Sequence, residues 1–283
     1  MKNILVTGGK GQLSSCIKVA SENLKDYNFI YVDLDQLDIT NELEVITFIN
    51  NNNLHYCINC AAYTAVDKAE SDKETARRVN ELGVKNLAKA CKENDLVLIH
   101  ISTDFVFDGK QTKLYKEEDR AEPLSVYGLT KLEGESIAAS LNKHFIIRTS
   151  WLYSEYGNNF LKTMLRLGEE KKLLHVVCDQ VGTPTYAGDL AEVILKIITN
   201  ESDKYGIYHF SNEGVASWYD FAKEIFEVSK TDIKVLPIKA DNYPTPAKRP
   251  AFSVMDKTKI KNAFEIEIPY WRDSIKKCLT KIT

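Results

Sequence analysis

The chain opens with Ile4-Leu5-Val6-Thr7-Gly8-Gly9-Lys10-Gly11-Gln12-Leu13, an apolar run that leads into a glycine-rich turn and then into a helical pattern. This order of strand, turn and helix is typical of dinucleotide binding, in which Gly8 permits the tight turn and Gly11 lets the backbone approach a pyrophosphate. The pyrophosphate rests on unpaired N–H groups at the helix N-terminus. A glycine turn without a ligand is the alternative, which the surrounding strand and helix disfavour. The expected cofactor-binding residues are Gly8, Gly11, Gln12 and Leu13.

An acidic residue, Asp33, follows the second predicted strand, 22 residues after Gly11. Its carboxylate is placed to accept hydrogen bonds from an adenosine ribose, and its charge disfavours a 2′-phosphate. Because no arginine stands nearby to offset that charge, we expect NADH to be favoured over NADPH, with the use of both left open. Asp38 and Ile39 would lie beside the adenine, although a solvated loop aspartate explains Asp38 nearly as well.

The first half of the chain alternates short apolar runs with longer helical stretches, as βαβ units of a parallel sheet do. The strands are nearly continuous apolar runs, which is expected where helices cover both faces. We therefore expect an α/β fold with a Rossmann-type doubly wound parallel sheet. The predicted strands are 4–7, 29–33, 56–60, 97–102 and 145–149, and the predicted helices are 12–24, 42–50, 76–93 and 127–141.

The pattern changes after the fifth strand, and three of the seven prolines fall in the loop 243–250. These prolines predict a rigid extended segment rather than a helix. We expect an NAD(P)-binding domain over 1–150, which about 174–200 rejoins, and a smaller mixed α/β substrate domain over 151–173 and 201–283. The smaller domain would cover the carboxyl edge of the sheet, where open α/β sheets bind ligands. Its predicted elements, with those that rejoin the sheet, are helices 160–168, 187–198, 218–228 and 271–281 and strands 175–178 and 208–210.

Composition excludes several classes of protein. The chain has 283 residues, of which 44% are hydrophobic and 27% charged, and a formal net charge of −3, as in an ordinary globular protein. No apolar run approaches the roughly 18 to 20 residues of a membrane span, and no long basic run indicates nucleic acid as a partner. The first residues lead directly into a strand without a hydrophobic leader, so we expect a cytoplasmic location.

Six cysteines are spread along the chain, and we expect them to be reduced. Two of them, Cys57 and Cys60, have the C-x-x-C spacing of redox and zinc sites, but there is no second pair and the five histidines are scattered. The pair also falls in a strand rather than at a helix start, where a thiol is activated. We favour the interpretation that both are small buried residues of a central strand, and we expect no metal site.

Tyr127 and Lys131 stand four residues apart, which places a phenol and an ammonium on one face of a helix. Hydride delivery to a ketone leaves an alkoxide that must be protonated, and a tyrosine can supply the proton. We expect the ammonium to lower the pKa of Tyr127 from about 10 toward neutrality and to hold the nicotinamide ribose. A second pair with this spacing, Tyr219 and Lys223, lies in the later half and is expected to pack.

Position along the chain distinguishes the two pairs. Tyr127 opens the helix after the fourth predicted strand, whose carboxyl end carries Ser102-Thr103-Asp104. A hydroxyl at that end can reach the same substrate oxygen from the sheet side, so Thr103 is expected to be the second donor to the carbonyl. Asp104 is either a substrate contact or a cap of the strand end.

Further motifs stand in order along the chain. They are Leu37-Asp38-Ile39-Thr40, Asn59-Cys60-Ala61-Ala62-Tyr63-Thr64-Ala65-Val66-Asp67-Lys68-Ala69-Glu70, Ser102-Thr103-Asp104-Phe105-Val106-Phe107-Asp108-Gly109, Arg148-Thr149-Ser150-Trp151-Leu152-Tyr153, Asp179-Gln180-Val181-Gly182-Thr183-Pro184-Thr185 and Arg249-Pro250. With the glycine-rich turn and the Tyr127/Lys131 pair, they resemble the extended short-chain dehydrogenases, and among them the dTDP-4-dehydrorhamnose reductases. The resemblance runs nearly end to end.

The resemblance implies NAD(P)H-dependent reduction of a dTDP-linked 4-keto-6-deoxy sugar, dTDP-4-dehydro-L-rhamnose, to dTDP-L-rhamnose. It also implies roles for residues of the matching motifs. Ala61, Ala62 and Tyr63 would line the cofactor. The implied substrate contacts are Thr103, Asp104, Trp151 and Arg249.

Three points stay open in this comparison. A buried structural tryptophan is the alternative for Trp151. Some family members dimerise through a magnesium ion held by glutamates, but Cys16 stands at the corresponding early position, so we predict no such site and leave open a monomer or a homodimer. The exact sugar, the nucleotide base and the product stereochemistry are also open.

Two other hypotheses compete with a reductase. A sugar-nucleotide 4,6-dehydratase or epimerase shares the fold and the Tyr/Lys pair, but in dehydratases an acid pair usually follows the strand-end threonine, and here Phe105 follows Asp104. A non-catalytic NAD(P)-binding regulatory subunit is the second alternative. The presence of Thr103, Tyr127 and Lys131 favours an enzyme over that subunit.

Overall fold

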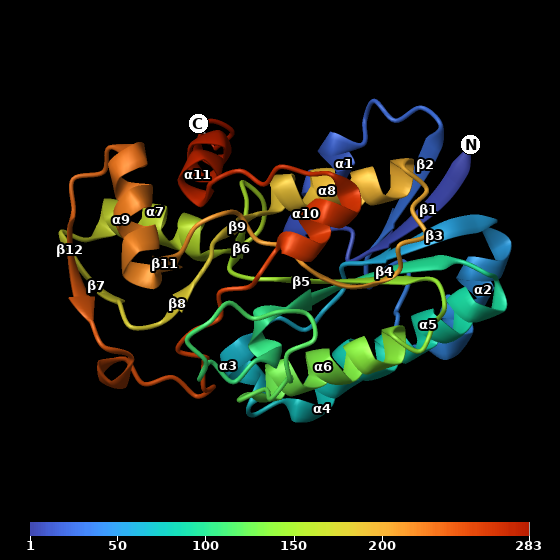
Figure 1. Ribbon diagram of the computed structural model, residues 1–283, viewed down its shortest axis with the longest axis horizontal. Coiled ribbons are helices and arrows are strands. Elements are labelled where there is room, and N and C mark those ends of the chain that lie inside the picture. Colours follow the sequence, from blue (N-terminus) through green and yellow to red (C-terminus); the bar gives the residue numbers. More distant parts are fainter. Residues whose placement is uncertain (283) are drawn as a thin grey trace.

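The computed structural model describes residues 1–282, and at its centre lies a six-stranded sheet (Figure 1). The strands follow the order β2-β1-β3-β4-β5-β10, and every neighbouring pair is parallel. The predicted doubly wound parallel sheet is therefore confirmed, with its first five strands near the predicted positions. The strands are β1 (Lys2–Thr7), β2 (Tyr27–Val32), β3 (Leu54–Asn59), β4 (Val97–Thr103), β5 (His144–Thr149) and β10 (Gly206–His209).

Helices cover both faces of this sheet (Figure 1). Side chains alternate between the two layers along each strand, so Ile4 and Val6 of β1 pack into one layer and Leu5 into the other, all three fully buried. The first layer holds α1 (Gln12–Ala20), α8 (Ala187–Thr199) and α10 (Thr258–Phe264), and the second holds α2 (Glu42–Asn51), α5 (Gly83–Glu93) and α6 (Val126–Ala138).

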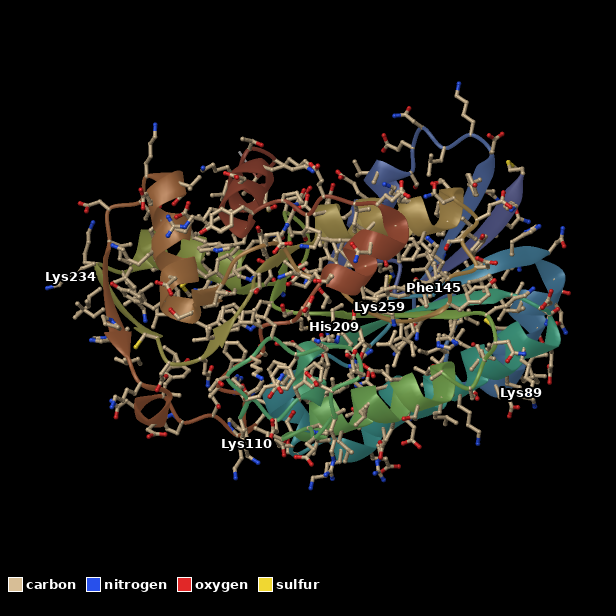
Figure 2. All side chains as sticks on the ribbon, viewed as in Figure 1. Lys89, Lys110, Phe145, His209, Lys234 and Lys259 are labelled. Atoms are coloured by element: carbon tan, nitrogen blue, oxygen red, sulfur yellow. The ribbon has the colours of Figure 1, made fainter. Side chains whose placement is uncertain are left out.

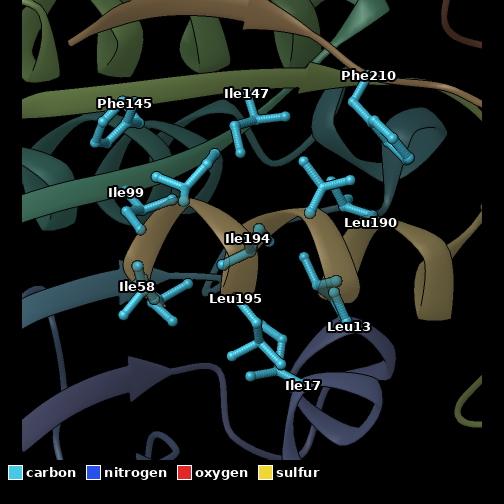
Figure 3. Close-up of a cluster of buried hydrophobic side chains, with 14 of the residues drawn as sticks. Leu13, Ile17, Ile58, Ile99, Phe145, Ile147, Leu190, Ile194, Leu195 and Phe210 are labelled. Carbon is cyan, nitrogen blue, oxygen red and sulfur yellow. The ribbon is translucent and has the colours of Figure 1, made fainter. Parts of the chain in front are cut away.

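Packing against α8 and the sheet holds α1 in its orientation. Leu13 and Ile17 of α1 belong to the same buried cluster as Leu190 and Ile194 of α8 and Ile58 of β3 (Figure 3). Burial of each such side chain stabilises the fold by about 1.5–3 kcal/mol. Because α1 begins at the glycine-rich turn, this packing holds the N-terminus of the helix at the carboxyl edge of the sheet.

The helix predicted over 76–93 is interrupted. It consists of α4 (Lys73–Arg77), a π-helical turn (Arg78–Leu82) and α5. Inside the turn, the buried side chain of Asn80 accepts a hydrogen bond from the backbone N–H of Tyr63 at 2.8 Å and donates to Thr130 Oγ1 at 3.1 Å. Asn80 therefore ties the loop after β3 to α6, and π-turns of this kind are frequent at functional sites.

The remaining elements form a smaller region at one end of the molecule (Figure 1). Its core contains Tyr153, Leu161, Phe221 and Trp271, which are almost completely buried. Its elements are α7 (Phe160–Glu170), α9 (Trp218–Ser229), α11 (Trp271–Leu279), the parallel pair β7 (Leu173–Val177) and β12 (Lys234–Ile238), and the short pairs β6 (Leu152–Tyr153) with β9 (Thr185–Tyr186) and β8 (Val181–Gly182) with β11 (Ala216–Ser217). Three further short turns are α3 (Val66–Ala69), η2 (Asp104–Val106) and η3 (Ala240–Asn242).

Two strands lie in a different part of the molecule from the one that the predicted domain boundaries assign to them. Strand β10 pairs with β5 in the main sheet, although we placed 201–283 in the smaller domain. Strand β7 pairs with β12, so within 174–200 it is α8 that rejoins the sheet. The sequence of a short strand does not show which sheet it joins, because its partner strand lies far along the chain. The loop 243–250 contains no helix, as predicted.

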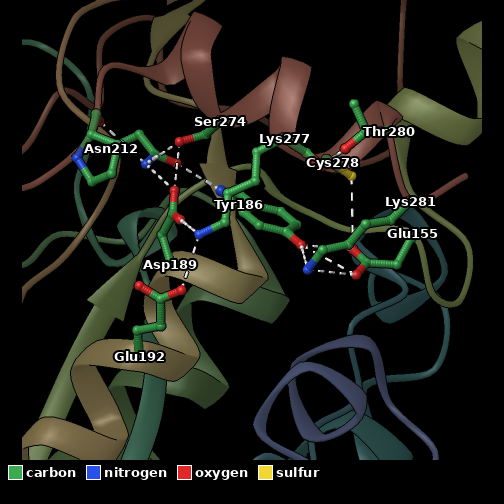
Figure 4. A network of polar contacts seen from close by, with 11 residues as sticks. Glu155, Tyr186, Asp189, Glu192, Asn212, Ser274, Lys277, Cys278, Thr280 and Lys281 are labelled. Atoms are coloured by element: carbon green, nitrogen blue, oxygen red, sulfur yellow. Dashed lines mark hydrogen bonds and ion pairs between the residues drawn. The ribbon is translucent and has the colours of Figure 1, made fainter. Parts of the chain in front are cut away.

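A buried carboxylate joins the smaller region to the sheet layers (Figure 4). Asp189 of α8 is 3% exposed and accepts hydrogen bonds from Asn212 Nδ2 at 2.7 Å, from Ser274 Oγ, and from Lys277 Nζ at 3.1 Å. Ser274 and Lys277 belong to α11. Because a buried charge without partners costs several kcal/mol, these contacts hold α11 against α8.

Many lysine side chains lie at the periphery of the molecule (Figure 2). Lys89, Lys110 and Lys234 project outward, whereas Phe145 and His209 lie inside the molecule (Figure 2).

Within residues 1–282, no helix is both long enough and apolar enough to cross a membrane. Those residues also contain no cluster of three or more histidine, cysteine, aspartate or glutamate side chains that could hold a metal ion.

The two cysteines of the C-x-x-C motif have different environments. Cys57 is fully buried in the layer that contains α5, as predicted. Cys60 lies one residue beyond the end of β3 and is half-buried, so its prediction as a strand residue is wrong. Desolvation raises the pKa of Cys60 to about 12, and its thiol therefore stays protonated.

Candidate active site

A cavity of about 840 Å³ runs along the carboxyl edge of the sheet. The segments that follow β1, β3, β4 and β5 line it, and α9 of the smaller region contributes to its wall. The structure brings together in this cavity every residue that the sequence predicts for the site, while the roles of these residues stay predictions. They are Gly8, Gly11, Gln12, Leu13, Asp33, Asp38, Ile39, Ala61, Ala62, Tyr63, Thr103, Asp104, Tyr127, Lys131, Trp151 and Arg249.

The glycine-rich turn has the geometry of an anion cradle. Gly8 has φ of +65°, and a Cβ there would lie 2.8 Å from the backbone nitrogen of Ala61, so a larger residue does not fit. The N–H of Gly11 donates to the carbonyl of Gly8 at 2.9 Å and closes the turn. Gly11 is also the N-cap of α1 and gives no side-chain cap, so the first N–H groups of the helix are available to a phosphate.

Asp33 is engaged by backbone groups. Its carboxylate accepts hydrogen bonds from the N–H groups of Lys10 and Leu34, both at 2.8 Å. The ammonium of Lys10 forms an exposed ion pair with Asp35 at 2.8 Å. Lys10 therefore places a cation beside Asp33 that can turn toward a phosphate. The expectation that NADH is favoured considered arginine only and did not include this lysine.

The loop after β2 forms the far end of the cavity. Asp38 Oδ1 accepts the N–H of Thr40 at 2.9 Å, which makes Asp38 a turn former as well as a cavity residue. Ile39 is 6% exposed, and its carbonyl accepts Asn86 Nδ2 at 2.9 Å. The loop is thus fixed from the α5 side.

Helix α6 brings Tyr127 against the end of β4. Ser125 caps the helix by accepting the N–H of Gly128 at 3.1 Å. A Cβ at Gly128 would collide with the carbonyl oxygen of Phe105, so glycine lets the first turn lie directly on this segment. The ring of Tyr127 packs edge-on against Phe105 with centroids 5.6 Å apart, and Thr103 lies close enough to its hydroxyl to lower the pKa of the phenol.

The pKa of Tyr127 differs from the expectation. Desolvation raises it to about 12, because the Thr103 hydrogen bond that lowers it is the smaller effect. The expectation that Lys131 lowers this pKa toward neutrality is therefore wrong. At neutral pH the side chain is a phenol, which is the form that can donate a proton.

Lys131 lies deeper in the same helix face and is 1% exposed. Its Nζ donates to the carbonyl of Ile101 at 2.7 Å and lies 3.5 Å from His100 Nε2. Desolvation lowers the pKa of Lys131 to about 8, against the opposing charge of Glu135. The side chain is thus mostly an ammonium at neutral pH and loses its charge more readily than an exposed lysine does.

A buried ion pair lies behind Lys131. Glu135 is one helical turn further along α6, and its carboxylate binds Arg148 of β5 at 2.8 Å, with both side chains at most 4% exposed. Ser102 of β4 also donates to Glu135. Ser102 and Arg148 belong to the motifs quoted above, but no pattern in the sequence relates them to Glu135.

Thr103 caps the short turn η2 that follows β4. Its Oγ1 accepts the N–H of Phe105 at 3.2 Å and donates to Asp104 Oδ1 at 3.2 Å. Asp104 is 1% exposed, and within residues 1–282 its Oδ2 has no partner at hydrogen-bond geometry, although the Ser253 hydroxyl interacts with the carboxylate. Burial raises the pKa of Asp104 to about 6. A buried carboxylate oxygen without a partner at a cavity wall is available to a hydroxyl of a ligand.

Trp151 has a backbone that is unusual for a bulky residue, with φ of +47°. Its indole stacks on that of Trp218, with centroids 3.6 Å apart and an angle of 9° between the planes. Trp218 also lines the cavity, and the sequence does not predict it there, because no pattern relates it to Trp151. Tyr219 packs against the core of the smaller region, as predicted.

Arg249 lines the cavity and forms an ion pair with Asp67. Its guanidinium binds the carboxylate of Asp67 at 2.8 and 3.1 Å and also donates to the carbonyl of Ala247 at 3.1 Å. The pairing lowers the pKa of Asp67 and keeps it ionised. Arg249, the expected substrate contact, is thus held in place by Asp67 of α3, in the segment that follows β3.

Cys16, which stands at the early position discussed above, is buried in α1. Desolvation raises its pKa to about 12, so the side chain is a neutral thiol. This thiol offers no charged ligand to a divalent ion.

Comparison with known proteins agrees with this geometry. The family model described as "RmlD substrate binding domain" matches residues 1–283. The dTDP-4-dehydrorhamnose reductase of Aggregatibacter actinomycetemcomitans is 46% identical over 288 residues, covering 98% of this chain and 98% of that protein.

Solved structures give the same result. A dTDP-4-dehydrorhamnose reductase from Clostridium acetobutylicum is 43% identical, covers 99% of both chains and has a TM-score of 0.95. The enzyme of that name from Bacillus anthracis, solved in complex with NADP, is 39% identical with a TM-score of 0.95 and covers 99% of this chain and 100% of that one. The chain therefore belongs to the RmlD family of dTDP-4-dehydrorhamnose reductases, which are nicotinamide-dependent oxidoreductases.

Proposed function

We propose that this chain reduces the 4-keto group of dTDP-4-dehydro-L-rhamnose to give dTDP-L-rhamnose, with NADH or NADPH as the cofactor. The observation that carries the proposal is one cavity in which Tyr127, Thr103 and Lys131 lie with the glycine-rich turn. Family membership supports the same substrate class. A nucleotide-linked sugar and a nicotinamide cofactor are cytoplasmic metabolites, so we place the reaction there.

The residues fit a dinucleotide. The turn at Gly8 excludes any Cβ, the uncapped N-terminus of α1 offers N–H donors, and Asp33 stands at the end of β2. A bound nicotinamide supplies the hydride that adds to the carbonyl carbon. The protein then supplies the proton and the stabilisation of charge.

Tyr127 is the proposed acid. Its phenol is protonated at neutral pH, so it can donate to the carbonyl oxygen as charge develops there. Thr103 lies beside Tyr127 on the sheet side, and its hydroxyl would turn from Asp104 to give the same oxygen a second donor. Lys131, buried one turn along the helix, stabilises the phenolate that remains and contacts the ribose.

Substrate contacts are assigned to the other end of the cavity. Asp104 Oδ2 accepts a hydroxyl of the sugar, Trp151 packs on the sugar, and Arg249 interacts with the nucleotide diphosphate. These assignments rest on the cavity lining, on the unpartnered oxygen of Asp104 and on the charge of Arg249. They account for an anionic, hydroxyl-rich ligand.

The cofactor preference follows from two opposing charges. The Asp33 carboxylate favours NADH, because a 2′-phosphate beside it is repelled. The Lys10 ammonium is largely exposed and can leave Asp35 to meet that phosphate. We therefore propose that both cofactors are used and that NADH has the lower KM.

The test is to incubate the purified protein with NADH or NADPH and a panel of dTDP-, GDP- and CDP-linked 4-keto sugars. We expect stoichiometric loss of reduced cofactor with the dTDP-4-keto-6-deoxy sugar and a product two hydrogens heavier by mass spectrometry. Conversion of the sugar without net loss of cofactor would instead indicate an epimerase or a dehydratase. Cofactor binding without conversion of any sugar would indicate the regulatory subunit.

A further inference from the structure

The backbone at Trp151 is the starting observation. Within residues 1–282, the other non-glycine residues with positive φ are polar and lie in turns or at helix ends: Asn53, Asp95, Glu201, Lys230 and Glu265. Trp151 is aromatic and lines the cavity directly after β5. The left-handed conformation is unfavourable for a bulky side chain and persists where the surroundings hold it, commonly at ligand sites.

Two residues of the smaller region hold the Trp151 indole. Trp218 covers one face of it with nearly parallel planes, 3.6 Å between centroids. Gly182 meets the Nε1–Cε2–Cζ2 edge of the indole, where an added Cβ would lie 2.8–2.9 Å from these atoms. The indole therefore has little freedom to move away from the cavity.

Trp218 is itself firmly placed. It is the first residue of α9, and Ser217 caps that helix through a reciprocal pair of hydrogen bonds with Asp220. Its ring also packs against Phe160, with centroids 4.7 Å apart and an angle of 49° between the planes. The stack thus spans from the end of β5, on the catalytic edge of the sheet, to the smaller region.

We propose that Trp218 is a positioning residue for the sugar nucleotide: it holds Trp151 in the left-handed conformation in which Trp151 contacts the substrate. The proposal rests on the proposed function, since it deepens the role of that site. It assigns to the smaller region a direct influence on substrate affinity. We expect little influence on cofactor binding, because neither tryptophan belongs to the glycine-rich turn or to the segment around Asp33.

The test compares Trp218→Ala with two matched variants, Trp218→Phe and Tyr219→Ala. Tyr219 is the next residue of α9, is half-buried in the same core and does not line the cavity. We expect Trp218→Ala to raise the KM for the sugar nucleotide roughly tenfold, the size of a lost aromatic pair, and to change the Kd of the cofactor less than twofold. Trp218→Phe should recover most of the affinity, and Tyr219→Ala should behave like the wild type.

A second measurement needs no substrate. Closely stacked indoles give an exciton-coupled band in the far-ultraviolet circular dichroism spectrum. The band should be present in the wild type and in Tyr219→Ala, and absent in Trp218→Ala, Trp218→Phe and Trp151→Phe. Absence of the band from the wild type would overturn the proposal. An unchanged KM in Trp218→Ala would also overturn it, and so would an equal rise in KM in Trp218→Ala and Tyr219→Ala. A wild-type protein that converts no keto sugar but shows the band would refute the proposed function while leaving the stack intact.

Discussion

The carboxylate of Asp67 and the guanidinium of Arg249 form a two-point ion pair at 2.8 and 3.1 Å that joins the loop after β3 to the proline-rich loop. The same carboxylate accepts the N–H of Ala247 at 3.2 Å. Residues 180 positions apart in sequence are thereby fixed at one wall of the cavity.

Replacing Asp67 by Asn keeps the shape of the side chain and removes its charge, which frees Arg249 to move. We expect the KM for the sugar nucleotide to rise about fivefold, with an unfolding free energy lower by less than about 1 kcal/mol because the pair is partly exposed. Steady-state kinetics and thermal unfolding measure the two quantities. Glu42→Gln is the matched control, since it breaks an exposed ion pair with Lys89 outside the cavity. An equal KM change in both variants would refute a specific role for the pair.

Tyr127→Phe removes one hydroxyl and retains the ring that packs on Phe105. We expect turnover to fall by roughly 10² to 10⁴, since the alkoxide loses its proton donor, while the Kd of the cofactor stays the same. Stopped-flow turnover and fluorescence titration with NADH test the two parts. Tyr219→Phe, the control from the second Tyr/Lys pair, should match the wild type. Wild-type turnover in Tyr127→Phe would remove this phenol from the mechanism.

The pH dependence follows from Lys131. Its pKa of about 8 means that the cation is present below that pH and is lost as the pH rises through it. Tyr127, with a pKa of about 12, stays protonated over the same range. We therefore expect kcat/KM to fall on the alkaline side of about pH 8. In Lys131→Arg the guanidinium keeps its charge, so the remaining activity should show no such fall, and an unchanged alkaline limb would contradict the assignment.

Lys10→Ala tests the choice of cofactor. Removing this ammonium leaves Asp33 alone beside the adenosine, so we expect the KM for NADPH to rise about fivefold and that for NADH to change little. The difference should shrink at high ionic strength, because the contact is exposed. Lys25→Ala is a suitable control, as this exposed lysine precedes β2 and lies at the opposite edge of the sheet. Equal changes for both cofactors would exclude a contact with the 2′-phosphate.

Local signals in the sequence predicted the parts of the fold that depend on neighbouring residues. The first strand, the glycine-rich turn and α1 are such a case, because glycine at position 8 is required by its own backbone conformation. Tyr127 was distinguished from Tyr219 by its place after the fourth strand, and the structure puts it in the cavity.

What the sequence could not predict depends on residues that are distant along the chain. The place of β10 in the main sheet depends on β5, about sixty residues earlier. The pKa of Tyr127 is determined by desolvation in an assembled cavity, which a helical spacing of four residues does not reveal. The Trp151–Trp218 stack and the Asp67–Arg249 pair likewise join segments that no periodic pattern relates.

The contacts of Asp189 bear on how the molecule unfolds. Its carboxylate lies on a helix of the sheet layers, while its hydrogen-bond donors come from the segment after β10 and from the last helix. Neither part can satisfy these groups alone, so the two should lose their structure together. Calorimetry should record one cooperative transition, and Asp189→Asn should lower its midpoint without splitting it in two. The chain would then behave as one thermodynamic unit, although its architecture divides into two.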